Sequence, residues 1–180
     1  QVLADRVIAP HLEQHAANVA LWRFHRRAGA DEDGHQFSVL FFSSRETARI
    51  IANRIAADPL LAHLHKAGLL RKTPFDDLGA PLQRDLANTS APNWPQAIQR
   101  SWPWYIMGVS AQWLRLNREV QETLPTPSET PGALLAHYES VHRAVSHLWR
   151  DHGQHAYLHH LNALFAYQPL LIQERTLKQF

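Results

Sequence analysis

The chain has 180 residues, of which 45% are apolar and 19% charged, as in folded globular proteins. Its 18 Lys and Arg residues nearly balance 16 Asp and Glu residues, so the basic excess typical of nucleic-acid-binding proteins is missing. The absence of cysteine excludes disulfides, thiolate nucleophiles and iron–sulfur clusters, and no run approaches the roughly 20 apolar residues that span a bilayer. We therefore expect one globular domain over residues 1–180.

The first 43 residues predict a short helix followed by a β-hairpin. Residues 2–17 predict a short helix or an irregular arm. Because Pro10 is tolerated only in the first turn of a helix, a helix here is expected to start near Ala9. The next two runs, 19–28 and 35–43, are apolar and aromatic and flank a turn rich in Gly and Asp. This pattern is typical of two paired antiparallel strands.

Alternation in these strands predicts which side chains share a face. It places five residues of the first strand together: Val19, Leu21, Arg23, His25 and Arg27. The second strand is apolar on both faces over residues 37–42, so we expect both faces to be covered at this end. Because a lone hairpin is marginal in water, its edge also suggests pairing with a partner protein or with a second copy of the chain.

Two short helices are expected after the hairpin, so that residues 18–70 form a hairpin with two helices. Ser43 and Glu46 have the spacing of a capping box at the start of the first helix. Asp58 followed by proline starts the second, and Gly68 ends it in the left-handed conformation. We expect these helices to cover one face of the hairpin.

Residues 71–92 carry three prolines and little periodicity, and we interpret them as an ordered crossover loop with one helical turn at Leu82–Leu86. The helical part then covers residues 93–180. Its first helix contains Pro103, so either this helix is kinked or a second helix begins at Ser101.

The most regular apolar stripe of the chain follows Thr130 and a proline. Its members recur every three or four residues: Leu134, Tyr138, Val141, Val145 and Leu148. Gly153 is predicted to end this helix, and a final helix is expected over residues 154–166. Together the segments predict a predominantly helical α+β fold, with an N-terminal hairpin packed on short helices and a C-terminal bundle of three to four helices.

The histidines are the first candidate for chemistry. His155 and His159 are four residues apart, the spacing at which two imidazoles on one helix can bind the same ion. His152 and Asp151 are near enough to add ligands, so these four residues predict a site for one divalent transition metal such as Zn. The alternative is chance spacing among 13 histidines, and Ala156 stands where an HExxH motif requires Glu.

A second candidate site is the cationic face of the first strand. Arg23, His25 and Arg27 project in a row and suit a carboxylate or phosphate, because guanidinium offers a bidentate fork. The alternative is a solvated surface paired with the acidic turn at residues 31–33. Trp104 is a third candidate for ligand contact, since it is the tryptophan expected to be most exposed, whereas core packing is the alternative for the whole tryptophan group.

No motif indicates catalysis, because the chain has no GxSxG, no phosphate-binding loop and no GxGxxG. We expect a non-catalytic binding or structural protein of the bacterial cell envelope that needs no cofactor. The cysteine-free chain begins at Gln1, which suits an exported protein of the periplasm or a lipoprotein of the outer membrane; a cytoplasmic protein is the alternative. The competing functions are a metal-dependent enzyme and a protein-partner module that uses the hairpin edge.

Overall fold

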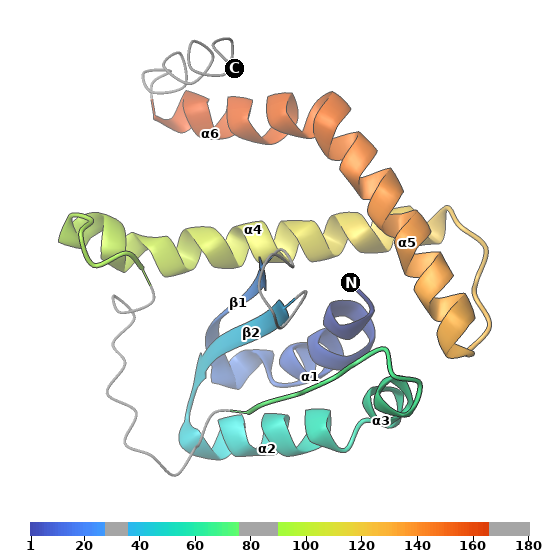
Figure 1. Ribbon diagram of the computed structural model, residues 1–180. Helices are drawn as coiled ribbons and strands as arrows, with labels where there is room; N and C mark the ends of the chain where they lie inside the picture. The colour runs from blue at the N-terminus through green and yellow to red at the C-terminus, as the bar shows by residue number, and fades with distance from the viewer. Residues whose placement is uncertain (28–35, 76–89, 166–180) are drawn as a thin grey trace. The chain divides into compact units, whose positions relative to one another are not determined.

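The computed structural model describes residues 1–27, 36–75 and 90–165 (Figure 1). These residues form helices and one two-stranded antiparallel hairpin, which confirms the predicted helical α+β fold. The chain divides into two compact units, Gln1–Tyr138 and Glu139–Phe180, and each is described by itself. The single domain expected from the sequence stays a prediction.

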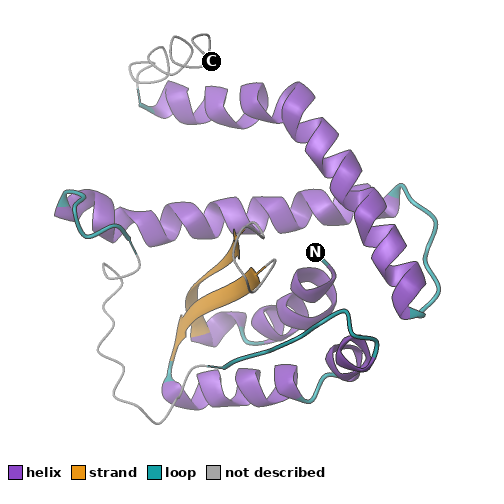
Figure 2. Cartoon of the chain, in the orientation of Figure 1, coloured by secondary structure: helices purple, strands orange, loops and turns teal. Residues whose placement is uncertain are grey.

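The first unit holds the hairpin and most of the helices (Figure 2). Its elements in chain order are η1 Leu3–Ile8, α1 Ala9–Gln14, η2 Ala16–Asn18, β1 Val19–Arg27, β2 Gln36–Ser43, α2 Arg45–Ala56, α3 Pro59–Lys66 and α4 Gln96–Glu122. Helix α5, Pro131–Leu148, begins in this unit and ends in the second. The second unit continues with η4 Trp149–Leu158 and α6 His159–Leu164; η1 and η4 are π-helical, and η2 is a short 3₁₀ turn.

The N-terminal helix begins earlier than predicted. It starts at Leu3 rather than near Ala9, and η1 runs directly into α1. In regular α-helical winding the ring of Pro10 would crowd the carbonyl of Arg6, four residues before it. The wider π-helical turn immediately before Pro10 relieves that clash, so the helix tolerates the proline after two turns instead of starting at it.

The hairpin matches its predicted limits but contains one bulge. β1 pairs with β2 so that Leu21 lies opposite Phe42, whereas Val19 lies opposite Ser43, which is a shift of one residue. Val19 therefore belongs to the buried core, and Leu21 turns to the other face. The predicted common face of Val19 and Leu21 is wrong for this reason, because a bulge reverses the alternation of side chains.

Short polar contacts begin and end the two helices after the hairpin. The Ser44 hydroxyl accepts a hydrogen bond from the Thr47 amide at 3.1 Å, so Ser44 is the N-cap of α2 and the predicted Ser43 is off by one residue. Asp58 caps α3 as predicted, with its carboxylate accepting from the Leu60 amide at 2.8 Å. Gly68 takes the predicted left-handed conformation, with φ at 69°.

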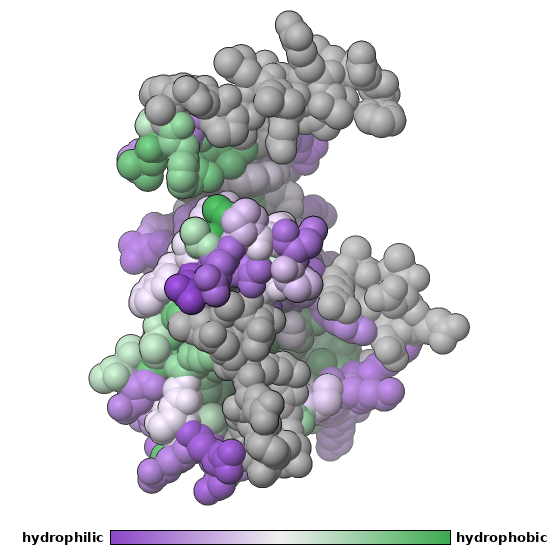
Figure 3. Space-filling view, turned by 90° about the vertical axis from the view of Figure 1, so that its left-hand side faces the viewer, coloured by the Kyte–Doolittle hydropathy of each residue, from purple (hydrophilic) through white to green (hydrophobic). Residues whose placement is uncertain are grey.

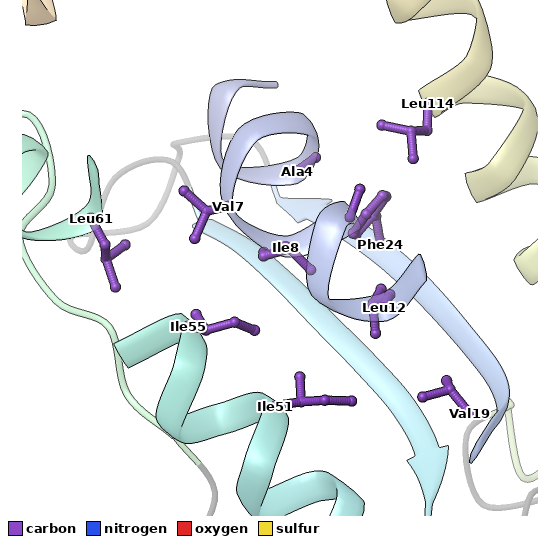
Figure 4. Close-up of a cluster of buried hydrophobic side chains, with 11 residues drawn as sticks. Ala4, Val7, Ile8, Leu12, Val19, Phe24, Ile51, Ile55, Leu61 and Leu114 are labelled. Carbon is purple, nitrogen blue, oxygen red and sulfur yellow. The ribbon is translucent and has the colours of Figure 1, made fainter. Parts of the chain in front are cut away.

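The core lies between the inner face of the hairpin and the helices η1, α1, α2 and α3 (Figure 4). Its buried side chains are Ala4, Val7, Ile8, Ala9, Leu12, Val19, Phe24, Ile51, Ile55, Leu61 and Leu114. Phe24 also meets Trp113 of α4 edge to face, with ring centroids 5.8 Å apart. The hairpin is thus covered by helices on one face and contacted by α4 at β1.

Helix α4 resolves the alternatives at Pro103, because it is one helix of 27 residues that contains the proline. Ser101 does not cap a second helix; its hydroxyl donates to the Ile98 carbonyl at 3.1 Å. Further along, the buried Ser110 hydroxyl accepts the Phe24 amide at 3.1 Å and donates to the Ile106 carbonyl at 2.8 Å. Ser110 therefore joins the edge of β1 to α4.

Helix α5 starts after Thr130 as predicted, and Leu134, Tyr138, Val141 and Val145 of its apolar stripe are buried. Gly153 does not end the helical run as predicted. The helix continues through Gly153 as η4, and a Cβ at this glycine would lie 2.7 Å from the Trp149 indole. Gly153 is thus needed for close packing of Trp149, not for a left-handed turn.

None of the helices in the described part of the chain combines the length and the apolar character needed to cross a membrane. The helical turn predicted at Leu82–Leu86 and the end of the helix predicted over 154–166 lie outside the described residues.

Candidate functional site

The outer face of the hairpin, turned away from the core, carries the clearest candidate site. A depression there has about 220 Å³ of empty space and is open to solvent. Its walls come from both strands and from α4: Leu21, Trp22, Arg23, Leu40, Phe42, Pro103 and Ile106. Six of these seven residues are apolar or aromatic, so the depression suits an apolar group.

The bulge in β1 builds this site. After the bulge, Leu21 and Arg23 lie on the outer face, directly opposite Phe42 and Leu40 of β2. Without the extra residue, the alternation that places Val19 in the core would place Leu21 there too. Residues 37–42 were predicted to be apolar on both faces. The structure accounts for this, because one face packs on the core and the other lines the depression.

Arg23 is the one charged residue in the wall of the depression. Its side chain is half-buried, and the described part of the chain offers its guanidinium neither a hydrogen bond nor an ion pair. A guanidinium has five N–H donors, which bind a carboxylate or phosphate in bidentate fashion. The apolar wall with one unpaired cation therefore suits a ligand group that is apolar at one end and anionic at the other.

The other residues predicted for ligand contact are placed differently. His25 is exposed and follows Arg23 on the outer face of β1, so it extends the cationic row without lining the depression. The side chain of Arg27 and the acidic turn lie outside the described residues. Trp104 is 58% exposed, which confirms its predicted exposure, but it is not part of the wall.

Sequence reasoning missed the α4 residues of the wall, Pro103 and Ile106. No local pattern links them to the hairpin, because the contact depends on where α4 crosses β1. The nearest signal was the apolar outer end of β2, which required some cover.

The first unit has a second charged centre, around Asp5, in which the charge is paired within the chain. The Asp5 carboxylate accepts hydrogen bonds from Arg118 Nε at 2.7 Å, Tyr138 Oη at 2.8 Å and Gln121 Nε2 at 3.1 Å. Burial alone would raise its pKa, but the donors Arg118, Tyr138 and Gln121 outweigh burial and hold the pKa of Asp5 below its ordinary value. Arg118 also donates to Glu13 at 2.7 Å.

The contact between Asp5 and Tyr138 shifts the pKa of Tyr138 in the opposite direction, upward. Burial, and then its hydrogen bond to Asp5, raise the pKa of the Tyr138 phenol, so it stays protonated and donates. The Asp5 carboxylate is paired with three donors of the chain, and this centre joins η1 to α4 and α5. Its hydrogen bonds are those of a structural contact.

The predicted metal residues lie in the second unit. His155 and His159 are exposed and stack, with ring centroids 5.2 Å apart and planes inclined by 28°. Asp151 and His152 are exposed in η4, and the described residues contain no group of three or more potential ligands that could hold a metal ion. The structure thus brings together two of the four predicted residues, and the metal site stays a prediction.

The same unit exposes apolar side chains. Trp149 and Tyr157 stack with centroids 6.1 Å apart, and Leu164 and Phe165 at the end of α6 are among the most exposed apolar residues described. Figure 3 shows apolar surface in its upper part.

Comparisons of the chain with family models, with curated proteins and with solved structures found no match.

Proposed function

We propose that the chain is a non-catalytic binding protein that holds a partner segment in the depression beside Arg23. The observation that supports this proposal is the half-buried guanidinium of Arg23 in an otherwise apolar wall, where none of the described residues pairs with it. Removing a cation partly from water without a partner is costly, and a bound anion offsets that cost. The ligand is expected to present an apolar side chain next to a carboxylate.

The open form of the depression favours a protein segment over a metabolite. Pockets for small molecules enclose most of the ligand surface. The depression here is open to solvent, so it suits contact with one side chain of a partner segment and not enclosure of a whole cofactor or substrate. Binding energy is then expected to come from that side chain and from the anion held by Arg23.

Two short peptides test this proposal. Acetylated Leu-Glu and Leu-Gln amides differ by a single charge, and each is titrated into ¹⁵N-labelled protein at low salt. We expect Leu-Glu to shift the amide signals of Leu21, Arg23 and Leu40 and to bind about tenfold more tightly than Leu-Gln, since a hydrogen bond to a charged group contributes roughly 1.5–3 kcal/mol. Equal affinities, or no shifts at millimolar peptide, would contradict the proposal.

Matched arginine variants locate the interaction. Arg23→Gln is expected to remove the preference for Leu-Glu. Arg26→Gln changes an exposed arginine of the same strand that does not line the depression, and the preference should persist. If both variants lose the preference for Leu-Glu equally, the preference comes from general electrostatic attraction and not from a site at Arg23.

A second candidate function, metal binding, is favoured by the stacked pair His155 and His159. Asn162 follows at a spacing that continues their helix face, and its Oδ1 is buried with no hydrogen-bond partner in the described structure. Two imidazoles leave most coordination positions open, whereas catalytic zinc sites usually have three protein ligands. We therefore place metal binding ahead of metal-dependent catalysis for these residues.

Calorimetric titration of untagged protein with Ni²⁺ or Zn²⁺ tests the histidine pair. One equivalent should bind to the native chain and be lost in His155→Ala/His159→Ala, while His160→Ala, an exposed neighbour, should leave it unchanged. Unchanged binding in the double variant would remove this candidate.

The cell envelope is retained as the proposed location, because a cysteine-free chain suits an oxidising compartment. Fractionation of the source organism with an antibody against the protein provides the test. Recovery with the cytosolic markers alone would contradict it.

A further inference from the structure

The two edges of the hairpin differ in what contacts them. The amide of Phe24 donates to Ser110 of α4, so it points away from β2. In an antiparallel ladder such a residue belongs to a pair that exchanges no hydrogen bonds, and both members point their backbone groups outward. Phe24 lies opposite Val39, so the N–H and C=O groups of Val39 point to the edge of β2 that faces away from β1.

This alternation repeats every second residue along the strand. Trp22 lies opposite Phe41 and Arg26 opposite Phe37, so Phe37, Val39 and Phe41 all point backbone groups to the same edge. Within the residues that the structure describes, the sheet has two strands and β2 pairs only with β1. Three donors and three acceptors are thereby presented in one row.

The sequence of β2 does nothing to block pairing at this edge. Exposed edges are usually protected by lysine, proline or a bulge. The strand from Gln36 to Ser43 has no charged residue and no proline, and the bulge of this hairpin lies in β1. An unprotected edge of this kind is expected in a protein that pairs this edge with another strand.

We propose that β2 pairs antiparallel with β2 of a second copy of the chain, about a two-fold axis at Val39. Val39 then lies opposite its own counterpart, and Phe37 lies opposite Phe41 of the second copy. The outward groups of these three residues are in register with those of the second copy, because an antiparallel two-fold axis reverses the order 37, 39, 41 onto itself. The product is one continuous four-stranded sheet.

Side chains on both faces favour the second copy as the occupant. On the inner face the pairing brings Phe37 next to Phe41 of the second copy, an aromatic cross-strand contact that stabilises sheets. The basic residues Arg23, His25 and Arg26 are on β1 and stay apart. The two β1 strands would be three strand spacings apart, about 14 Å, which exceeds the Debye length of about 8 Å at physiological salt.

Single cysteines test the register, since the chain has no cysteine of its own. In Val39→Cys the two sulfurs face each other across a hydrogen-bonded pair with Cα atoms about 5.5 Å apart, within the range for a disulfide. In the control, Ser38→Cys, the two cysteines are diagonal at about 7–8 Å, beyond that range. Mild oxidation is expected to give about tenfold more covalent dimer for Val39→Cys than for Ser38→Cys.

Two measurements on the unmodified protein keep the proposal testable if Val39→Cys misfolds. Sedimentation should give twice the 20.6 kDa mass of one chain, with dissociation on dilution. Amide exchange of Phe37, Val39 and Phe41 should be slow and should slow further as concentration rises, because pairing alone protects these outward amides. A monomer at high micromolar concentration with rapid exchange of the three amides would overturn the proposal, as would equal cross-linking of the two cysteine variants.

The dimer does not depend on the ligand proposed for the depression. Pairing uses backbone groups at the edge of β2, whereas the ligand contacts side chains of the outer face. Arg23→Gln is therefore expected to lose the peptide preference and still sediment as a dimer, so either proposal can fail without the other.

Discussion

Asp5 and Arg23 are two partly buried charged residues of the same unit, and they differ in whether the chain pairs their charges. The side chain of Asp5 is 11% exposed and accepts hydrogen bonds from three side chains of α4 and α5. Arg23 is half-buried in the wall of an open depression and has no partner in the described part of the chain. The first charge holds elements together, and the second lies in the depression where we propose that a ligand binds.

Pairing within the chain is therefore a criterion that distinguishes structural charges from charges proposed to bind a ligand. A structural charge has all its hydrogen-bonding capacity filled from within, so its removal leaves other groups unpaired. A charge kept for binding leaves nothing unpaired when it is removed. Stability measurements on matched variants therefore test the comparison directly.

The largest effect is expected for Asp5→Ala. This change leaves Arg118, Gln121 and Tyr138 without their common acceptor, and we expect a loss of about 2–3 kcal/mol after allowance for the partial exposure of Arg118. Urea unfolding followed by circular dichroism measures it. Glu129→Ala removes a carboxylate from the exposed pair with Arg6 and should cost less than about 1 kcal/mol; equal losses would contradict the structural role of Asp5.

The pH dependence of stability gives the next effect. The pKa of Asp5 is lower in the folded chain than its ordinary unfolded value of about 3.9, so the unfolded chain binds the proton more readily. The stabilisation is fully present above about pH 5 and is lost as pH falls through the folded pKa. Native protein should lose stability between pH 5 and 3 more steeply than Asp5→Asn, and parallel curves would show that Asp5 contributes nothing to the acid response.

Ser110→Ala applies the same test to a neutral group. The variant leaves the buried Phe24 amide without an acceptor, and we expect a loss of about 1–2 kcal/mol. Ser101→Ala is the matched control, because this exposed hydroxyl bonds only to a carbonyl of its own helix. A thermal unfolding comparison in which the two variants behave alike would mean that Ser110 does not secure β1.

The smallest change in stability is expected for Arg23→Leu. The leucine keeps the wall apolar and leaves no hydrogen-bonding group unpaired, so the free energy of unfolding should change by no more than about 0.5 kcal/mol. A loss above about 1.5 kcal/mol would show that Arg23 has a structural partner after all and would remove the contrast with Asp5.

Local physics was enough to predict the hairpin limits, the Asp58 cap, the Gly68 turn and the start of α5. Each depends on a few neighbouring residues, so the signal is present in a short window of sequence. The predicted apolar stripe of α5 was correct for four residues, but Leu148 is 41% exposed. Leu148 is the last residue of α5, and the π-helical η4 begins at Trp149.

The features that sequence reasoning missed depend on distant or irregular structure. The donors to Asp5 are more than 110 positions away in the sequence, and no pattern near Asp5 predicts them. The bulge in β1 shifts one residue, and that shift decides whether Leu21 lies in the core or in the candidate site. Arg23 was identified from its charge and strand position alone, whereas the wall around it required the crossing of α4 over the hairpin.

Pro103 affects how the backbone hydrogen bonds of α4 open during amide hydrogen exchange. Proline has no amide hydrogen, so the Gln99 carbonyl loses its normal helical donor, four residues further along. The part after Pro103 is secured by Ser110, Leu114, Asn117 and Val120, all buried. Its amide protons should exchange with solvent only when the whole unit unfolds, while those before Pro103 should exchange through a smaller, separate opening. We therefore expect one continuous helix to contain two cooperative segments of different stability, with the boundary at a single missing hydrogen bond.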